Sequence, residues 1–263
     1  MELASAVDEL REILRGEGRA ALLENLLQLE RRVHSLREGP MRRAVTREFV
    51  SGLEAAPLIA FLDLLMQRNR DGVSRTRGVM QQFALEPTVL RDLPYTRTKL
   101  AYQLALETQR PQVAELFMGD ALDRDTAHAI EFQSNDHMDL PAGIRLSAAR
   151  LQDRFRLDRL IHDRDPRVIS NLLHNPRIVE RDVVKIAAMR PTNPAVLLVV
   201  AGHPRWSSNY RVRKAITLNP HTPESLVRRL LPTLMRQDLK LALRSGVLKG
   251  RAKAHAQALI QPS

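Results

Sequence analysis

Apolar residues recur at a fixed distance after three prolines in the second half of the chain. The prolines belong to the dipeptides Asp165-Pro166, Asn193-Pro194 and Thr222-Pro223, and successive ones are 28 and 29 residues apart. Asp, Asn and Thr side chains accept backbone N–H bonds at a helix start, and proline suits the first helical position. The third and seventh residues after each proline share one face of the predicted helix. These residues are Ile169, Leu173, Leu197, Ala201, Leu226 and Leu230.

Each interval between these prolines has room for two short helices with a second proline break between them. The pattern predicts helices over about 166–174 and 180–190, 194–202 and 209–218, 223–231 and 234–244, and a last one over about 248–260. A single short helix cannot bury its apolar stripe, whereas stacked pairs bury it on both sides. We therefore predict an all-α fold, specifically a right-handed α-solenoid of short two-helix repeats.

The proline pattern continues more weakly toward the N-terminus. Its earlier members are Pro57, Pro87, Pro111 and Pro141. The section 119–160 is the least regular, and its polar run 133–137 indicates a loop or a boundary between two halves. We predict three parts: an N-terminal helical cap, degenerate helical repeats, and regular repeats with a basic surface and a C-terminal capping helix. Their bounds are 1–40, 41–160 and 161–263.

Two helices are expected near the N-terminus, over 3–15 and 19–37, with Gly16 and Gly18 ending the first. In the second, apolar residues with a 4-3-4-3 spacing form a seam like that of a coiled coil. They are Leu22, Leu26, Leu29, Val33 and Leu36. Two interpretations stay open: a hairpin that caps the first repeat, and a coiled coil that forms a homodimer through residues 19–37. The seam is short of the about three or four heptads typical of coiled coils, which favours the hairpin.

Short two-helix units with Asn-Pro or His-Pro between the helices resemble the bacterial HEAT-like and leucine-rich-repeat-variant solenoids. The resemblance is carried by Asp165-Pro166, Asn175-Pro176, Asn193-Pro194, His203-Pro204, Asn219-Pro220 and Thr222-Pro223. It implies HEAT-like repeats and a scaffold that binds proteins. One branch of the class, the alkylpurine DNA glycosylases, binds DNA on a basic concave face. Some leucine-rich-repeat variants hold a cysteine-bound cluster, which this cysteine-free chain cannot carry.

Composition adds an uneven charge to this picture. The net charge is +11, and residues 205–263 alone carry twelve Lys and Arg against Glu224 and Asp238. The lack of cysteine excludes disulfides and thiolate catalysis. The N-terminal residues do not read as a signal peptide, and no apolar run approaches the about 20 residues needed to span a bilayer. We expect a soluble, cytoplasmic protein.

The best candidate binding surface lies in this basic region. The segment 203–214 combines the only tryptophan with a tyrosine and four cations at a predicted helix start, where anions and bases bind. Arg236, Lys240 and Arg244 follow at i, i+4 and i+8, a stripe that suits a row of phosphates. The candidate residues are Arg205, Trp206, Tyr210, Arg211, Lys214, Arg228, Arg229, Arg236, Lys240 and Arg244. The alternatives are that Trp206, one repeat after Ile178, packs between layers, and that the stripe is a solvated face.

The sequence predicts no catalytic residues, no cofactor and no metal site. The clusters His162-Asp163-Arg164-Asp165 and Asp136-His137-Met138-Asp139 lack a third ligand at helical spacing. The resulting hypothesis is a non-enzymatic scaffold that binds a protein partner through its solenoid surface. The alternative is nucleic-acid binding through the basic C-terminal third, related to the HEAT-like glycosylases.

Overall fold

The computed structural model describes residues 2–85, 88–117 and 140–261. Within these ranges the regular elements are all helices, so the all-α prediction is confirmed. The chain forms two compact units, one of residues 1–119 with 255–263 and one of residues 120–254. The first break falls at the start of the irregular section 119–160. The predicted loop 133–137 and Pro87 lie outside the described residues.

The first unit is built around α4 (Ala55–Arg70), which packs against five other helices of this unit. Those five are α1 (Glu2–Arg15), α2 (Glu17–Ser35), α5 (Ser74–Leu85), α7 (Tyr95–Glu107) and α8 (Pro111–Ala114). The remaining elements are α3 (Gly39–Ser51), α6 (Thr88–Arg91) and the 3-10 turn η1 (Glu115–Phe117). Ten residues of α4 are buried, including Phe61 and Leu65. This helix is therefore apolar on nearly all sides, as a helix at the centre of a bundle must be.

The section 41–160, for which degenerate repeats are predicted, contains α4, and the contacts of α4 reach beyond its neighbours in sequence. A helix in a stack of pairs contacts its neighbours in sequence, whereas α4 also contacts α1 and α8. Pro57 lies in the first turn of α4 and Pro111 begins α8, so both prolines do mark helix starts. Because proline suits the first turn of any helix, its spacing here carried no information about tertiary packing.

The apolar seam of α2 is buried within its own chain. Leu22, Leu26, Leu29 and Val33 are all buried, and α2 packs against α1, α3, α4 and α5. Gly16 separates α1 from α2, but Gly18 lies inside α2 rather than ending α1. The seam therefore serves the first unit, and a homodimer would have to use another face of the helix.

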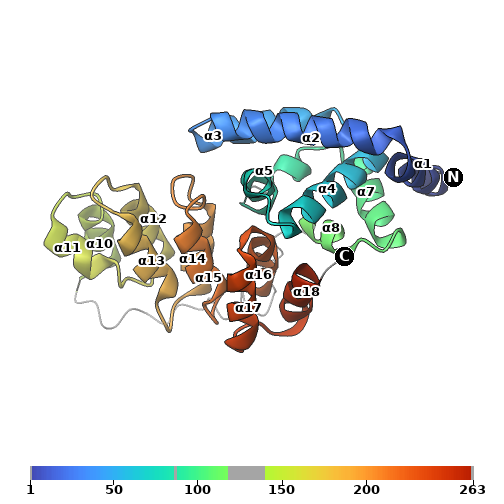
Figure 1. Cartoon of the computed structure of the whole chain (residues 1–263). Coiled ribbons are helices and arrows are strands. Elements are labelled where there is room, and N and C mark those ends of the chain that lie inside the picture. The colour runs from blue at the N-terminus through green and yellow to red at the C-terminus, as the bar shows by residue number, and fades with distance from the viewer. Residues whose placement is uncertain (1, 86–87, 118–139, 262–263) are drawn as a thin grey trace. The chain divides into compact units, whose positions relative to one another are not determined.

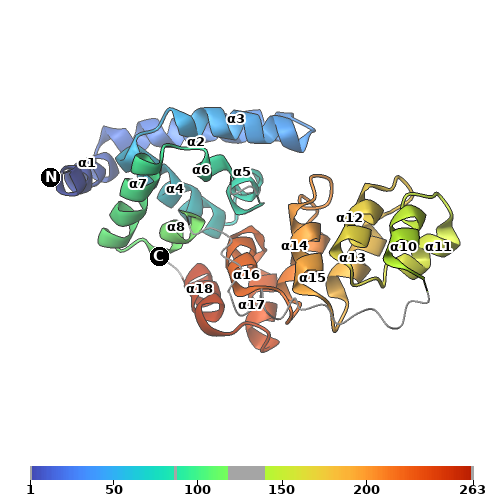
Figure 2. The same cartoon turned by 180° about the vertical axis from the view of Figure 1, so that it is seen from behind.

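The described part of the second unit, from residue 140 onward, consists of four successive helix pairs and the start of a last helix (Figures 1 and 2). Pair 1 is α10 (Ala142–Ala148) and α11 (Arg154–Leu160), and pair 2 is α12 (Pro166–His174) and α13 (Glu180–Ala188). Pair 3 is α14 (Pro194–Gly202) and α15 (Tyr210–Thr217). Pair 4 is α16 (Glu224–Leu230), continued by η2 (Leu231–Thr233), and α17 (Arg236–Arg244). The last helix is α18 (Gly250–Ile260). The predicted bounds are confirmed to within two residues, and those of α12 and α14 hold at both ends.

Two of the three predicted helix caps are confirmed. Asp165 accepts from the backbone N–H of Arg167 at 2.9 Å, and Asn193 accepts from that of Ala195 at 2.9 Å. Thr222 is a correction: Pro223 is the capping residue of α16, and the Thr222 hydroxyl instead donates to the Ile216 carbonyl at 2.6 Å. The Ile216 carbonyl also accepts the Asn219 N–H at 3.0 Å, so the Thr222 hydroxyl adds a second bond to the end of α15 and turns away from the start of α16.

Pairs 1, 2 and 3 pack on one another through like helices. α12 contacts α10 and α14, and α13 contacts α15, and both views draw these helices side by side in chain order (Figures 1 and 2). Two asparagine amides link the pairs further. Asn175 donates to the Ala149 and Leu151 carbonyls at 2.9 and 2.8 Å. Asn219 donates to the carbonyls of residues 187 and 189 at 2.8 and 2.9 Å. Each thus satisfies carbonyls at the end of a helix in the pair before it.

Candidate binding surfaces

Trp206, from the predicted surface segment, is an interior residue. It is 5% exposed, and its indole N–H donates to the Leu173 carbonyl at 3.0 Å. Ile178, at the same place one repeat earlier, is also fully buried. The packing interpretation therefore describes Trp206, and its ring is not presented to a ligand. The Arg205 guanidinium lies 4.3 Å from the centre of that ring, on the exposed side.

Tyr210 and Lys214 converge on a buried carboxylate. The Tyr210 hydroxyl hydrogen-bonds Asp238, and the Lys214 ammonium lies 2.8 Å from the other carboxylate oxygen. These contacts lower the pKa of Asp238 against the opposing effect of its burial. Both predicted surface residues therefore join α15 to α17. The start of α15 is also already occupied, because Asn209 accepts from the Arg211 and Val212 N–H groups. It offers no ready anion site.

The remaining predicted cations do reach solvent. Arg205 and Arg211 are exposed, while Arg228 and Arg229 are half-buried. The stripe Arg236, Lys240 and Arg244 is exposed along α17, opposite the buried residues of that helix. The structure thus divides the ten predicted residues into a structural group around Trp206 and Asp238 and a set of outward-facing cations.

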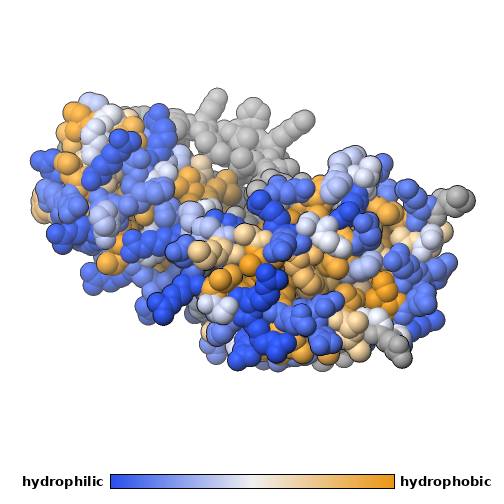
Figure 3. Space-filling model, turned by 90° about the horizontal axis from the view of Figure 1, so that it is seen from above, coloured by the Kyte–Doolittle hydropathy of each residue, from blue (hydrophilic) through white to orange (hydrophobic). Residues whose placement is uncertain are grey.

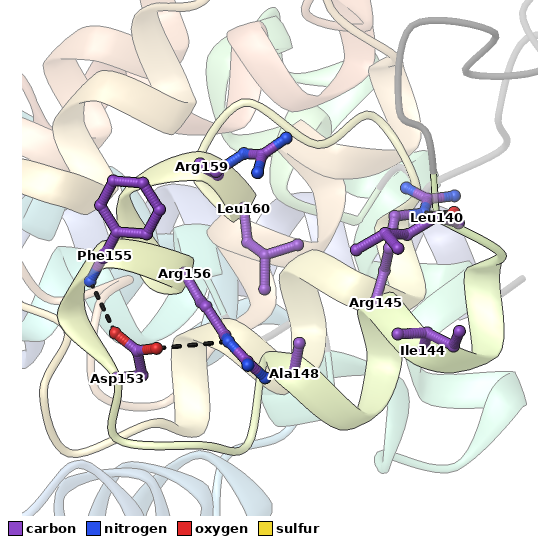
Figure 4. Close-up of a pocket in the computed structure, with 9 residues that line it drawn as sticks. All are labelled: Leu140, Ile144, Arg145, Ala148, Asp153, Phe155, Arg156, Arg159 and Leu160. Carbon is purple, nitrogen blue, oxygen red and sulfur yellow. Dashed lines mark hydrogen bonds and ion pairs between the residues drawn. The ribbon is translucent and has the colours of Figure 1, made fainter.

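A pocket that the sequence reasoning did not predict lies between α10 and α11 (Figure 4). Its volume is about 510 Å³. It is lined by Leu140, Ile144, Arg145, Ala148, Asp153, Phe155, Arg156, Arg159 and Leu160. Three large apolar side chains in it are open to solvent: Leu140 at 46%, Ile144 at 53% and Phe155 at 73%. Apolar residues beside arginines make this the second unit's most distinctive described concavity.

Ile144 is exposed at a position that later pairs bury. It is the third residue of α10, and the third residues of α12, α14 and α16 are Val168, Val196 and Leu226, all buried. Pairs 2 and 3 are each covered by the pair before them, whereas no described residue covers pair 1 in this way. Phe155 is unusual for a different reason. It is the second residue of α11, where α13, α15 and α17 carry exposed polar residues, Arg181, Arg211 and Gln237.

In each pair, the third residue of the second helix can be compared between pairs, and the comparison shows which neighbouring pair this residue faces. Asp182 in α13 accepts two bonds, at 2.8 and 2.7 Å, from Arg154, the first residue of α11 in the pair before it. Asp238 in α17 is bonded in the same way by Tyr210, the first residue of α15. A third residue therefore points toward the preceding pair. In α11 this residue is Arg156, which lines the pocket.

The charges of the pocket are only partly neutralised. Arg145 is buried and paired with the fully buried Asp163. Arg156 is paired with Asp153 at 3.2 Å, and Asp153 also accepts the Phe155 N–H at the start of α11 (Figure 4). For Arg159, which is exposed, the described residues supply no ion pair. The pocket rim therefore carries net positive charge.

The predicted histidine clusters do not assemble a metal site among the described residues. Asp163 accepts the Asp165 N–H at 2.9 Å, and Asp165 caps α12, so both carboxylates have structural roles. No group of three or more metal-ligating side chains occurs in the described part of the chain. The cluster 136–139 lies outside it. None of the described helices combines the length and apolar character that crossing a bilayer requires.

Comparison with protein-family models, with curated proteins and with solved structures gives no match.

The face seen from above carries hydrophilic residues over most of its area, with hydrophobic patches among them (Figure 3). The candidate surfaces therefore rest on the geometry alone: the exposed cations of α17 and the apolar, arginine-rimmed pocket of pair 1.

Proposed function

We propose that the protein is a non-enzymatic scaffold that binds a protein partner. In this proposal pairs 1–4 form a short, right-handed α-solenoid of HEAT-like repeats. The contacts of α12 with α14 and of α13 with α15 support it, as do the links of Asn175 and Asn219 to the preceding pairs. Such a stack can bury the apolar face of each pair only against the next one, so an uncovered end pair retains an adhesive surface.

The exposed apolar end of pair 1 carries the proposal. Ile144 and Phe155 leave more than half of their surface in water beside a pocket of about 510 Å³. An exposed aromatic anchor next to a pocket, with arginines at the rim, has the composition of residues that dominate protein–protein binding energy. Proteins seldom keep contiguous apolar surface in water without a binding role.

A capture experiment with the full chain tests this proposal. We expect nuclease-treated native lysate to yield a stoichiometric protein partner, and the substitution Phe155→Glu to abolish its capture. Leu106→Glu is the matched control, because Leu106 is a similarly exposed apolar residue in the first unit. Recovery of nucleic acid alone, or capture that Phe155→Glu leaves unchanged, would contradict a partner at this end.

Nucleic-acid binding is the second candidate, and the cation stripe of α17 favours it. Arg236, Lys240 and Arg244 are one helical turn apart and exposed, so they can neutralise successive phosphates. We expect the affinity for duplex or single-stranded nucleic acid, measured by fluorescence anisotropy, to fall steeply between about 50 and 200 mM salt. Reversing the three charges should reduce the salt slope by about 0.9 for each phosphate that the protein no longer neutralises.

The control for this titration reverses three exposed arginines of the first unit, Arg15, Arg31 and Arg37. Equal effects of the two triple variants would mean that net charge, not the stripe, governs the binding. The absence of binding at about 50 mM salt would remove this second candidate altogether.

A further inference from the structure

We infer that the end of pair 1 that no described residue covers binds an acidic amphipathic helix of the partner protein, which takes the place of a preceding pair. This inference rests on the proposed function and specifies the partner's chemistry. It commits to a helix because the surface to be covered is of the kind that helices cover between pairs 1, 2 and 3.

The apolar part of the site sets the spacing of the ligand. Ile144 comes from α10 and Phe155 from α11, so the pocket lies in a groove between two helices (Figure 4). A ridge of apolar side chains at i, i+3 or i+4, and i+7 of a third helix fits such a groove. The equivalent later positions Val168 and Val196 are fully buried under their neighbours, which indicates how completely this groove can be covered.

The charged residues of the site determine the sign of the charge that the ligand must carry. In pairs 2 and 4 the third residue of the second helix is an acid that bonds a side chain of the preceding pair, and Asp182 takes the cation Arg154; in pair 3 it is the buried Val212. In α11 the third residue is the cation Arg156 instead, so the complementary group from the occupant is a carboxylate. Arg159, three residues further along the same helix, adds a second positive charge on the groove side. Two carboxylates about one helical turn apart would meet both.

The other charges of the pocket do not oppose this assignment. The buried pair Arg145–Asp163 is already neutral and needs no ligand. Asp153 is held by Arg156 and by the Phe155 N–H. When a carboxylate from the occupant joins Arg156, the guanidinium can serve both acids, because it presents five N–H donors. A helix with lysines at these positions would instead meet two cations.

The test uses the full chain and two labelled synthetic helices of 14 residues. Both carry leucines at i, i+3, i+4 and i+7; one has glutamates on the flanks and the other has lysines. We expect fluorescence anisotropy to show binding of the glutamate peptide at least about tenfold tighter than that of the lysine peptide, as close interfacial charge pairs produce. Arg156→Glu with Arg159→Glu should reverse this preference, and Phe155→Ala should weaken both peptides.

Lys185→Glu is the matched control, because Lys185 is exposed on α13, away from the pocket, and its reversal should leave the preference unchanged. Equal binding of the two peptides, or no binding, overturns the inference. Two other occupants of the groove would each give a distinct result. A second copy would appear as a dimer in light scattering that Phe155→Glu dissociates. The chain's own residues 120–139 would appear as peptide binding that requires their replacement by a Gly-Ser segment.

The failure of this inference and that of the proposed function are distinguishable. A partner captured through Phe155 that proves basic or non-helical would leave the scaffold in place and remove the acidic helix. Peptide binding without any captured protein would do the reverse.

Discussion

A buried carboxylate at the third position of a second helix bonds a side chain of the preceding pair. Asp182 is fully buried, holds Arg154 through both of its oxygens, and accepts the Val179 N–H at 3.2 Å. The hydrogen bond from Arg154 is the main cause of the lowered pKa of Asp182, and burial opposes it. The carboxylate is therefore charged in the folded protein, and its charge is used within the fold.

Asp182→Asn should destabilise the protein by about 2 kcal/mol, because it replaces two charge-assisted hydrogen bonds from Arg154 with contacts to a neutral amide, while Asp158 still pairs with Arg154. Since the pKa of Asp182 is lower in the folded than in the unfolded chain, its contribution is present above about pH 4 and is lost below it. Urea unfolding at pH 7 and pH 3 should therefore show the difference between the two proteins shrinking in acid. Asp158→Asn, at a half-exposed partner of the same arginine, should cost less than about 0.5 kcal/mol. Equal costs would contradict the assignment.

His203 gives a second pH dependence, also on the acid side. Burial, together with smaller contributions from the neighbouring His174 and Arg205, lowers the pKa of His203 to about 4. A histidine whose pKa is lower in the folded than in the unfolded chain must gain a proton on unfolding, so stability is full above about pH 6.5 and is lost toward pH 4. The loss amounts to at most about 3 kcal/mol.

His203→Asn should remove this loss. Asparagine occupies the same cap position one pair earlier, at Asn175, where it accepts a backbone N–H as the Nδ1 atom of His203 does. Unfolding free energies of both proteins at pH 7 and pH 4.5 would measure the effect, with the exposed His221→Asn as the control. An unchanged pH dependence in His203→Asn would show that other groups cause it.

At the scale of elements, helix starts were predictable and their packing was not. Asp165-Pro166 and Asn193-Pro194 fixed two helices to the residue, because capping is a matter of adjacent atoms. The same reasoning treated Pro57 as a repeat start, although α4 is the buried centre of a bundle. Contacts of α4 with α1, α7 and α8 join residues far apart in sequence, and no local pattern encodes them.

The pocket was missed for a related reason. Ile144 is the third residue after Pro141, as Ile169 is after Pro166, so its position alone does not distinguish it from a core residue. Phe155 could have been found by aligning the second helices at their caps, since its counterparts are Arg181, Arg211 and Gln237. An aromatic in a column of polar residues is a sequence-level indication of a site, because packing does not require it there.

The buried seam of α2 leads to a prediction for this element. Leu26→Ala should destabilise the protein by about 2–5 kcal/mol through the cavity it leaves, without changing the association state. Leu27, next to it, is partly exposed, so Leu27→Ala is the matched control and should cost less than about 1 kcal/mol. Sedimentation equilibrium and urea unfolding would separate the two effects. A lower association constant in Leu26→Ala would restore the homodimer interpretation.

At the scale of the whole molecule, the proposed repeats predict which deletions the chain tolerates. Deleting residues 166–193 joins Asp165 to Pro194, so an Asp-Pro helix start is regenerated and one pair is lost. We expect this variant to remain helical by circular dichroism and to unfold cooperatively. Deleting residues 166–185 removes part of a pair and should not give a folded second unit. Equal behaviour of the two deletions would count against a modular stack.

A third deletion, of residues 194–222, also removes one pair but should be less stable than the first by about 2 kcal/mol or more. It would bring α13 against α17, so that Glu180, the first residue of α13, faces Asp238. It would also remove Tyr210 and Lys214, the two side chains that hold Asp238. Urea midpoints of the two deletion variants provide the measurement.

The contacts of Arg154 with Asp182 and of Tyr210 with Asp238 are specific to the boundaries between pairs 1 and 2 and between pairs 3 and 4. Similar helix pairs in one chain can pack in the wrong order during folding, because their apolar faces are nearly interchangeable. Skipping pair 3 sets Glu180 against Asp238, so repulsion between two acids disfavours that misassembled form. Charged contacts therefore favour one order of the pairs, while apolar residues determine how the pairs pack.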